Sequence, residues 1–253
     1  MSRAQDTSAT LAAASGRLRD TVAGLRRTGW PRVAVVYDPL TYAWEPHVRY
    51  LERYGRKSPR RLVLVGMNPG PWGMGQTGVP FGDPVLVRDW MGIGGAVDQP
   101  DVVHPRRPVR GFSSTRREGS GQRLYGWAKD RWKTAERFFD DVFVTNYCPL
   151  MLLGENGENL TPADLPRRDM AALFEACDAA LAEVLEALAP DVVVGVGNFA
   201  RQRVEKVVGE RKLPCRVGGI MHPSPANPHA NRNWAETVET ELERLGVAIP
   251  GRS

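Results

Sequence analysis

Cysteine is scarce in this sequence, where Cys148, Cys177 and Cys215 are the only three among 253 residues. They lie far apart and form no Cys-x-x-Cys pair. We therefore expect neither a disulfide framework nor a cysteine-held metal or iron–sulfur cluster. Long apolar runs are also missing, since none approaches the roughly 18 residues of a membrane span. Residues 1–15 lack the apolar core of a signal peptide. These absences favour a protein of the cell interior with no metal and no membrane partner.

Positive charge is in mild excess, with 34 Lys and Arg against 29 Asp and Glu and a net charge of +5. Such an excess is weak evidence for a polyanionic partner. The length supports one good-sized core and does not require a second domain. We therefore expect residues 1–253 to form a single domain, with residues 1–30 as a frayed helical extension at the N-terminus.

Strand and helix patterns alternate along the chain. Short apolar runs predict strands, and longer stretches with helical spacing predict helices. The expected strands are 32–37, 62–65, 141–145, 191–196 and 216–221, and the expected helices are 8–27, 42–54, 85–91, 124–139, 170–188, 199–208 and 234–245. This alternation predicts an α/β fold of three layers, with a central, mainly parallel sheet flanked by helices.

Polar side chains follow the ends of three of these strands. They are Asn68, Asn146 and His222. The carboxyl ends of parallel strands lie at the edge where α/β proteins bind ligands, so we expect these residues to converge on one pocket. Residues 66–82 form a long glycine-rich loop whose backbone can approach a flat ligand. Within that loop, Phe81 offers a ring on which such a ligand can stack.

A basic cluster lies in residues 98–122, which show no regular pattern. Arg106, Arg107 and Arg110 occur there among Pro, Ser and Gly residues. Loops of this length are commonly functional or mobile. The sequence leaves two interpretations open, namely contact with phosphate groups and a solvated, flexible loop.

Three motifs, in order, resemble those of the single-strand-selective monofunctional uracil-DNA glycosylases, a family within the uracil-DNA glycosylase superfamily. Gly-Met-Asn-Pro-Gly-Pro at 66–71, with Gln-Thr-Gly-Val-Pro-Phe-Gly at 76–82, resembles the first motif. Thr-Asn-Tyr-Cys-Pro-Leu at 145–150 resembles the segment that reads uracil. His-Pro-Ser-Pro-Ala-Asn-Pro at 222–228 resembles the late catalytic and wedge motif. The similarity extends from about Val33 to Gly246.

This resemblance implies a monofunctional DNA glycosylase that flips uracil out of DNA and hydrolyses its N-glycosidic bond. The product would be an abasic site for base excision repair. The resemblance assigns Asn68 to the attacking water and His222 to the charge that develops on uracil O2. The residues it assigns to the base are Met67, Gly70, Phe81 and Asn146.

Gly70 stands where another branch of the superfamily has a Tyr that crowds C5 of the base. We therefore expect space at this position. By resemblance, we also expect activity on 5-substituted uracils such as 5-hydroxymethyluracil.

The late motif also implies how DNA is held. The segment that would enter the duplex as a wedge is Pro223, Ser224, Pro225, Ala226 and Asn227. The tip of this wedge is commonly Arg in the family, whereas here it is Ala226. We expect a monomer without a cofactor that binds single-stranded and double-stranded DNA containing uracil. It would act in the cytoplasm of a bacterium or in the nucleus of a eukaryote.

Two other functions fit parts of the sequence. Gly195-x-Gly197-x-x-Ala200 after a strand matches a dinucleotide fingerprint, but residues 214–222 lack the acidic residue that such a site needs. The second alternative is a non-catalytic binder of damaged or single-stranded DNA. Asn68 and His222 argue against it, because binding alone requires neither residue.

Overall fold

The computed structural model describes residues 3–26 and 29–251 of the chain. Its centre is a parallel sheet with the strand order β3-β2-β6-β7. The strands are β2 (Leu62–Gly66), β3 (Val142–Asn146), β6 (Val192–Val196) and β7 (Arg216–Ile220). Every residue of β2 and β6 is buried, because helices cover both faces of a sheet of this kind. The predicted α/β fold with a mainly parallel sheet is confirmed.

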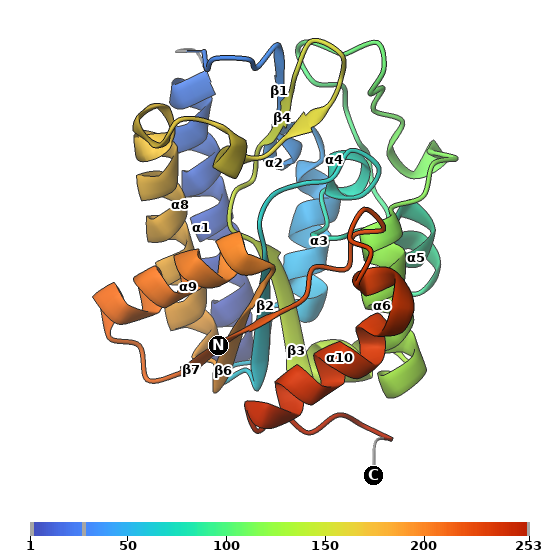
Figure 1. The fold of residues 1–253 in the computed structure, drawn as a ribbon, viewed down its shortest axis with the longest axis vertical. Coiled ribbons are helices and arrows are strands. Elements are labelled where there is room, and N and C mark those ends of the chain that lie inside the picture. Colours follow the sequence, from blue (N-terminus) through green and yellow to red (C-terminus); the bar gives the residue numbers. More distant parts are fainter. Residues whose placement is uncertain (1–2, 27–28, 252–253) are drawn as a thin grey trace.

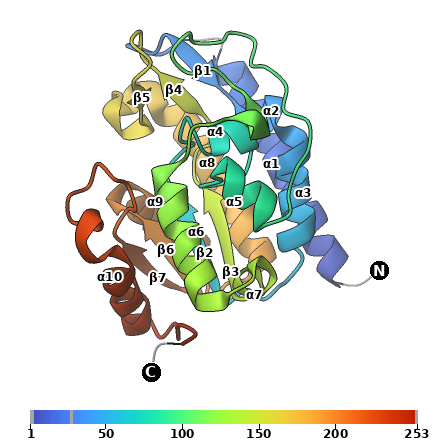
Figure 2. The ribbon, with the colours of Figure 1, turned by 90° about the vertical axis from the view of Figure 1, so that its right-hand side faces the viewer.

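Helices lie on both sides of this sheet (Figure 1). α8 (Arg167–Leu188) and α9 (Asn198–Arg211) form the crossovers into β6 and β7 and contact each other. α6 (Gly119–Trp132) and α10 (Ala230–Arg244) lie on the opposite side in Figure 1. They meet through Trp127 and Trp234, whose rings pack edge to face. Figure 2 shows α6 lying lengthwise in front of the strands.

The N-terminal helix α1 (Arg3–Arg26) packs along α8. Its Leu11 and Val22 are buried in the main core. The helical extension expected over residues 1–30 also includes positions 1, 2, 27 and 28, which lie outside the described residues.

Shorter helices fill the connections between these elements. They are α2 (Pro39–Tyr42), α3 (Trp44–Tyr54), α4 (Met74–Thr77), α5 (Pro84–Asp89), α7 (Ala135–Asp141) and the 3-10 turns Gly111–Ser113 and Pro162–Asp164. α3 covers the outer edge of the sheet at β3. The Tyr50 hydroxyl donates to the Val144 carbonyl at 2.7 Å and accepts from the Val144 N–H at 3.3 Å. These bonds satisfy backbone groups that an edge strand would otherwise leave unpaired.

The alternation of strands and helices placed the strand expected over residues 32–37 in the parallel sheet. The structure corrects this, because that strand lies outside the parallel sheet. β1 (Val35–Tyr37) pairs antiparallel with β4 (Met151–Leu153). β4 also pairs antiparallel with β5 (Asn159–Leu160). The sequence pattern did not predict β4 or β5. This second small sheet therefore gives residues 35–37 a hydrogen-bonding partner that the sequence pattern did not reveal.

All three cysteines are free thiols, and Cys148 and Cys177 are buried. Within residues 3–26 and 29–251, no helix combines the length and apolar character that crossing a bilayer requires. Over the same residues, no group of three or more His, Cys, Asp or Glu side chains is arranged to hold a metal ion.

Candidate active site

A cavity of about 340 Å³ opens where β2 and β3 end. Gly66, the last residue of β2, lies beside Asn146, the last residue of β3, so both following loops start from one edge. The loop after β7 reaches the same cavity. The predicted site residues that line it are Met67, Asn68, Gly70, Phe81, Asn146, His222 and Ser224. The fold thus brings the three strand-end residues together.

Asn146 lies tightly against the end of β2. A Cβ atom on Gly66 would be 2.4 Å from Asn146 Oδ1 and 2.6 Å from Phe81 Cε2. Only Gly therefore lets both side chains approach this strand end. The Asn146 amide nitrogen donates to Met74 Sδ at 3.2 Å, which fixes the side on which that nitrogen lies.

Asn68 is half-buried two residues beyond β2. Its amide nitrogen donates to the Leu150 carbonyl at 3.4 Å. Leu150 lies in the segment after β3, so this bond also links the loops of the two strands. With the nitrogen turned toward Leu150, the amide carbonyl oxygen faces the other way and can accept a hydrogen bond from a water molecule.

Phe81 has a backbone conformation that non-glycine residues seldom adopt, with φ of 54°. Two contacts of α6 hold it there. The Tyr125 hydroxyl donates to the Pro80 carbonyl at 2.7 Å, and a Cβ atom on Gly121 would lie only 1.9 Å from the Phe81 carbonyl oxygen. The Phe81 ring lies 6.0 Å from the His222 ring, between centroids. The loop is thus shaped to present this ring to the cavity.

His222 is held in one tautomer by the residues that follow it. The Ser224 backbone N–H donates to Nδ1 of His222 at 3.1 Å. An accepting Nδ1 carries no proton, so Nε2 is the protonated nitrogen of a neutral ring. Burial lowers the pKa of His222, which also favours the neutral form. The side chain can therefore donate one hydrogen bond into the cavity.

Glu118 lines the same cavity, although the sequence gave no sign of it. A Cβ atom on Gly70 would lie 2.7 Å from Glu118 Oε2. The space expected beside Gly70 is therefore not empty, which corrects that expectation. Burial raises the pKa of Glu118, partly offset by the backbone N–H groups of Ser120 and Trp72. The cavity is thus lined by a carboxylate as well as the amides of Asn68, Asn146 and Asn159 and an imidazole.

Arg123 on α6 holds the loop that carries His222, a role that the sequence did not reveal. Its guanidinium donates to the Pro223 carbonyl at 2.9 Å and to Asn231 Oδ1 at 2.8 Å. The Asn231 amide in turn donates to the Pro225 carbonyl at 2.9 Å. These bonds fasten the loop that carries His222 to α6. Ala226, at the middle of that loop, remains exposed.

The three arginines of the basic loop differ in their surroundings. Arg107 donates to the Gly157 carbonyl at 2.6 Å, and its guanidinium lies 5.5 Å from the centre of the Trp72 ring. Arg106 is exposed and donates to the Asn156 carbonyl at 3.2 Å. Arg110 is exposed, and its backbone N–H is bound by Gln76 Oε1 at 2.7 Å. The loop is thus fixed along its backbone while two of its guanidinium groups face solvent.

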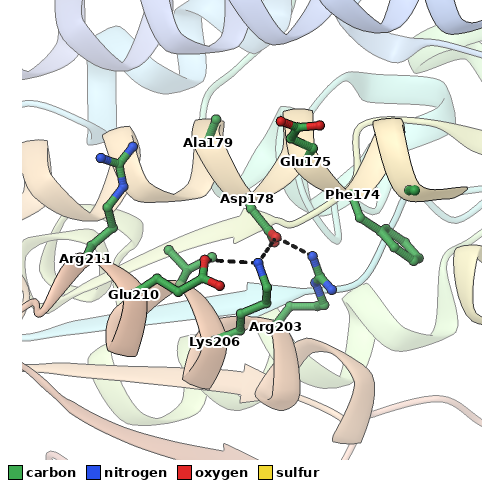
Figure 3. A pocket seen from close by; sticks show the side chains of 10 residues that line it. Phe174, Glu175, Asp178, Ala179, Arg203, Lys206, Glu210 and Arg211 are labelled. Carbon is green, nitrogen blue, oxygen red and sulfur yellow. Dashed lines mark hydrogen bonds and ion pairs between the residues drawn. The ribbon is translucent and has the colours of Figure 1, made fainter. Parts of the chain in front are cut away.

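A larger cavity of about 500 Å³ lies between α8 and α9, away from the strand ends (Figure 3). Its cations already have acidic partners, since Arg203 and Lys206 both pair with Asp178, and Lys206 also with Glu210. A phosphate would have to displace these carboxylates. Asp178 also accepts from the Tyr147 hydroxyl at 2.8 Å. This cluster therefore supports the residue next to Asn146 rather than offering an anion site.

Close packing accounts for the glycines of the dinucleotide-like pattern. A Cβ atom on Gly195 would lie 2.1 Å from the backbone nitrogen of Arg201 in α9. Gly197 has φ of 88°, and a Cβ atom there would lie 3.5 Å from the Cβ of His222. Both glycines thus bring α9 and the His222 loop close to the end of β6.

Comparisons with known proteins agree with these motifs. The sequence model of the family described as "Uracil DNA glycosylase superfamily" matches residues 52–243. A curated protein of Bos taurus named "Single-strand selective monofunctional uracil DNA glycosylase" is 44% identical over 215 residues, covering 85% of this chain and 79% of that protein. Its counterpart from Rattus norvegicus is 45% identical, covering 85% of this chain and 77% of that protein.

A solved structure described as Pedobacter heparinus SMUG2 superimposes with a TM-score of 0.62, over 90% of this chain and 97% of the other. The two sequences are 18% identical, so this likeness concerns the fold alone.

Proposed function

Because this chain belongs to the uracil DNA glycosylase superfamily and to its single-strand selective monofunctional branch, we propose that the cavity beside β2 and β3 binds a flipped uracil. The protein is a uracil-DNA glycosylase, a hydrolase of N-glycosyl bonds that acts on DNA in base excision repair. The observation that carries the proposed site is the meeting of Asn68, Asn146 and His222 in one cavity.

His222 acts on the leaving base in this proposal. As the bond between N1 and C1′ breaks, negative charge gathers on uracil O2 while the sugar becomes oxocarbenium-like. The neutral ring donates from Nε2 to O2, because Nδ1 is occupied by the Ser224 N–H. A donor aimed at a developing oxyanion typically contributes on the order of 10²–10³ in rate.

Asn68 positions the water that attacks C1′. An amide cannot take a proton from water, but its carbonyl oxygen can accept a hydrogen bond and hold the water in line. The bond from the Asn68 nitrogen to the Leu150 carbonyl supports this role, because it leaves the oxygen available. Catalysis by this residue is therefore positional rather than acid–base.

Asn146 reads the base, and Phe81 stacks on it. Uracil presents a donor at N3 and an acceptor at O4, which an Asn amide complements, whereas cytosine reverses the pair. Discrimination requires that the amide cannot turn over. The contact of its nitrogen with Met74 Sδ, the fit of its oxygen against Gly66 and the anchoring of the next residue, Tyr147, all oppose that rotation.

The loop from Pro223 to Asn227 enters the DNA as a wedge, and the exposed Arg106 and Arg110 contact phosphate groups together with Arg107. Flipping a base costs a few kcal/mol of unstacking, which a wedge side chain offsets by filling the gap. Ala226 has only a methyl group for this purpose. Single-stranded or mispaired uracil, which is less firmly stacked, is therefore the preferred substrate.

We also propose that the enzyme accepts some 5-substituted uracils, as its resemblance to the family implies, with the Glu118 carboxylate rather than empty space beside Gly70. The enzyme acts as a monomer, with the cavity face free to receive DNA. It works in the cytoplasm of a bacterium or in the nucleus of a eukaryote.

An abasic-site assay separates this activity from non-catalytic DNA binding. The wild-type protein is incubated with a single-stranded oligonucleotide carrying one uracil, and the products are analysed with and without alkali. The expected result is release of free uracil and cleavage at that position only after alkali. An oligonucleotide with cytosine in place of uracil is the matched substrate control. Tight binding without an abasic product would favour the non-catalytic binder.

A further inference from the structure

We propose that Trp72 stacks on an unpaired base next to the flipped uracil, and that Arg116 binds the phosphate group of the same nucleotide. This inference rests on the proposed function, because it needs a DNA strand across the cavity. Trp72 is half-buried, and the guanidinium groups of Arg107 and Arg116 each lie 5.5 Å from the centre of its ring. An aromatic ring among cations suits a single strand, since the ring stacks on a base while the cations attract the backbone.

Trp72 lies beside the cavity rather than inside it. The preceding residue, Pro71, lines the cavity, whereas Trp72 itself does not. The Trp72 backbone N–H donates to the carboxylate of Glu118, which is another lining residue. The indole is therefore joined to the cavity wall through its own backbone, within reach of the nucleotide next to the bound one.

The start of α6 connects Trp72 with the proposed wedge, residues 223–227. A Cβ atom on Gly73 would be 2.8 Å from Glu118 Cγ. A Cβ atom on Gly119 would be 2.6 Å from Pro225 Cγ. Both loops thus pack on consecutive residues at the same helix end. A strand that binds the wedge and places its uracil in the cavity therefore has a neighbouring base close to Trp72.

One buried amide fixes the surface around Trp72 by joining its two loops. The Gln76 amide nitrogen donates to the Pro71 carbonyl at 2.8 Å and to the Pro108 carbonyl at 3.1 Å. Its oxygen accepts from the Arg110 backbone N–H at 2.7 Å. Gln76 is only 2% exposed, so these three bonds satisfy a buried polar group. The glycine-rich loop and the basic loop are thus held together before DNA binds, which lowers the ordering cost of binding.

The two guanidinium groups beside the ring differ in their freedom to move. Arg107 is half-buried and donates to the Gly157 carbonyl at 2.6 Å, so it stays in place. Arg116 is exposed, and among the described residues its guanidinium has neither a hydrogen bond nor an ion pair. The next residue, Arg117, is by contrast paired with Asp83. Arg116 can therefore move aside as a base stacks on the indole and can then pair with phosphate.

Stacking on Trp72 requires a base that is free to turn. In a single strand, the neighbour of the uracil has no pairing partner, so its face can contact the indole. In a duplex, the same base is paired, and reaching Trp72 would add the cost of unpairing it to the cost of flipping the uracil. Trp72 therefore promotes excision from single strands more than from duplexes.

The test removes the base from the substrate and the ring from the protein separately. Single-stranded oligonucleotides carry one uracil, and a tetrahydrofuran abasic spacer replaces the nucleotide on its 5′ side, on its 3′ side or on neither side. Excision is measured in single-turnover experiments with enzyme below saturation, so that the rate reports binding as well as chemistry. The enzymes are wild type, Trp72→Ala and Trp72→Phe.

For wild type, the spacer on one side of the uracil should lower the rate about tenfold, the loss expected for one base–aromatic stack. Trp72→Ala should lose about the same factor on the unmodified oligonucleotide and nothing further with that spacer. Trp72→Phe, which keeps an aromatic ring, should retain most of the rate and of the spacer effect. The ratio of single-strand to U·A duplex rates should fall in Trp72→Ala.

Arg116→Gln tests the phosphate contact on its own. Below saturation, the slope of log rate against log salt on the unmodified single strand should become shallower by about 0.7, the value for one phosphate contact. The spacer effect should remain, because the indole is still present. A slope equal to that of wild type would remove Arg116 from phosphate binding.

Trp44→Ala is the matched control. Trp44 is also half-buried beside a cation, since the Arg19 guanidinium lies 4.5 Å from the centre of its ring. It is the first residue of α3 and does not line the cavity. This variant should keep the wild-type spacer effect.

A wild-type rate that neither spacer changes would overturn the inference. The same conclusion would follow if Trp72→Ala still lost about tenfold with the spacer, because another group would then hold the neighbouring base. Failure of the proposed function itself would look different, since the wild-type enzyme would then release no uracil from any of the oligonucleotides.

Discussion

Acidification should destabilise this protein through His47, a buried residue of α3. Its Nδ1 donates to the Gly78 carbonyl at 2.9 Å, so Nε2 accepts from the Ser15 hydroxyl at 3.0 Å and the ring is neutral. Gly78 belongs to the glycine-rich loop of residues 66–82. Protonation of His47 would therefore destabilise the contact between α3 and the loop that carries Asn68.

The size of the effect follows from the pKa of His47, which burial lowers from 6.5 to about 4. Between pH 6.5 and pH 4 the side chain of His47 is protonated in the unfolded chain but neutral in the folded protein. The stability due to neutral His47 is thus complete above pH 6.5 and is lost as the pH falls toward 4. Linkage gives a decrease of about 2 kcal/mol in the free energy of unfolding between pH 7.5 and pH 5. That is a large part of the roughly 5–15 kcal/mol typical of a domain.

Urea denaturation at several pH values between 7.5 and 5 measures this decrease. In His47→Gln, which cannot titrate in this range, the decrease should be smaller than in wild type by about 2 kcal/mol. Ser15→Ala is the matched control, because it removes the hydrogen-bond partner of His47 and keeps the titrating ring. Its stability should be lower at every pH, with the wild-type dependence retained. Equal pH dependence in wild type and His47→Gln would refute the reasoning.

Three further predictions concern recognition of the base and of DNA. Asn146→Asp, whose carboxyl group can hold a proton, should lower uracil excision and admit cytosine, and unchanged uracil kinetics would remove Asn146 from base reading. Neutralising Arg106, Arg107 and Arg110 should weaken DNA binding and reduce the slope of log K against log salt by roughly one per lost phosphate contact. A slope equal to that of wild type would mean that the loop only faces solvent. Ala226→Arg should raise excision from U·A and U·G duplexes while the single-strand rate changes little. If the ratio of duplex to single-strand rates stays constant, residue 226 is not at the wedge tip.

Much of the cavity could be predicted because its residues follow strand ends that the sequence marks clearly. The apolar runs of β2, β3 and β6 are short and continuous, and Asn68 and Asn146 come at or just after two of them. Parallel pairing then places these strand ends at one edge. Asn68 and Asn146 thus reach the same cavity for reasons already present in the local pattern.

Glu118 and Arg123 could not be found in this way, because their places depend on tertiary contacts. Glu118 reaches the cavity because Asp83 anchors its backbone, whereas Arg123 holds the distant loop that carries His222 by donating to the Pro223 carbonyl. The side chains themselves resemble ordinary surface charges in the sequence. The antiparallel pairing of residues 35–37 with β4 was missed for a similar reason, since the short strand β4 shows no clear pattern of its own.

The most direct test of the proposed mechanism is the single-turnover rate of uracil excision by Asn68→Ala and His222→Ala. Each variant should lose on the order of 10²–10³ or more in rate on a single-stranded uracil substrate, with a melting temperature near that of wild type. Asn156→Ala, an exposed position on the turn between β4 and β5, is the control and should retain the wild-type rate. If both cavity variants excise uracil at close to the wild-type rate, the assignment of water and O2 to these two residues is wrong.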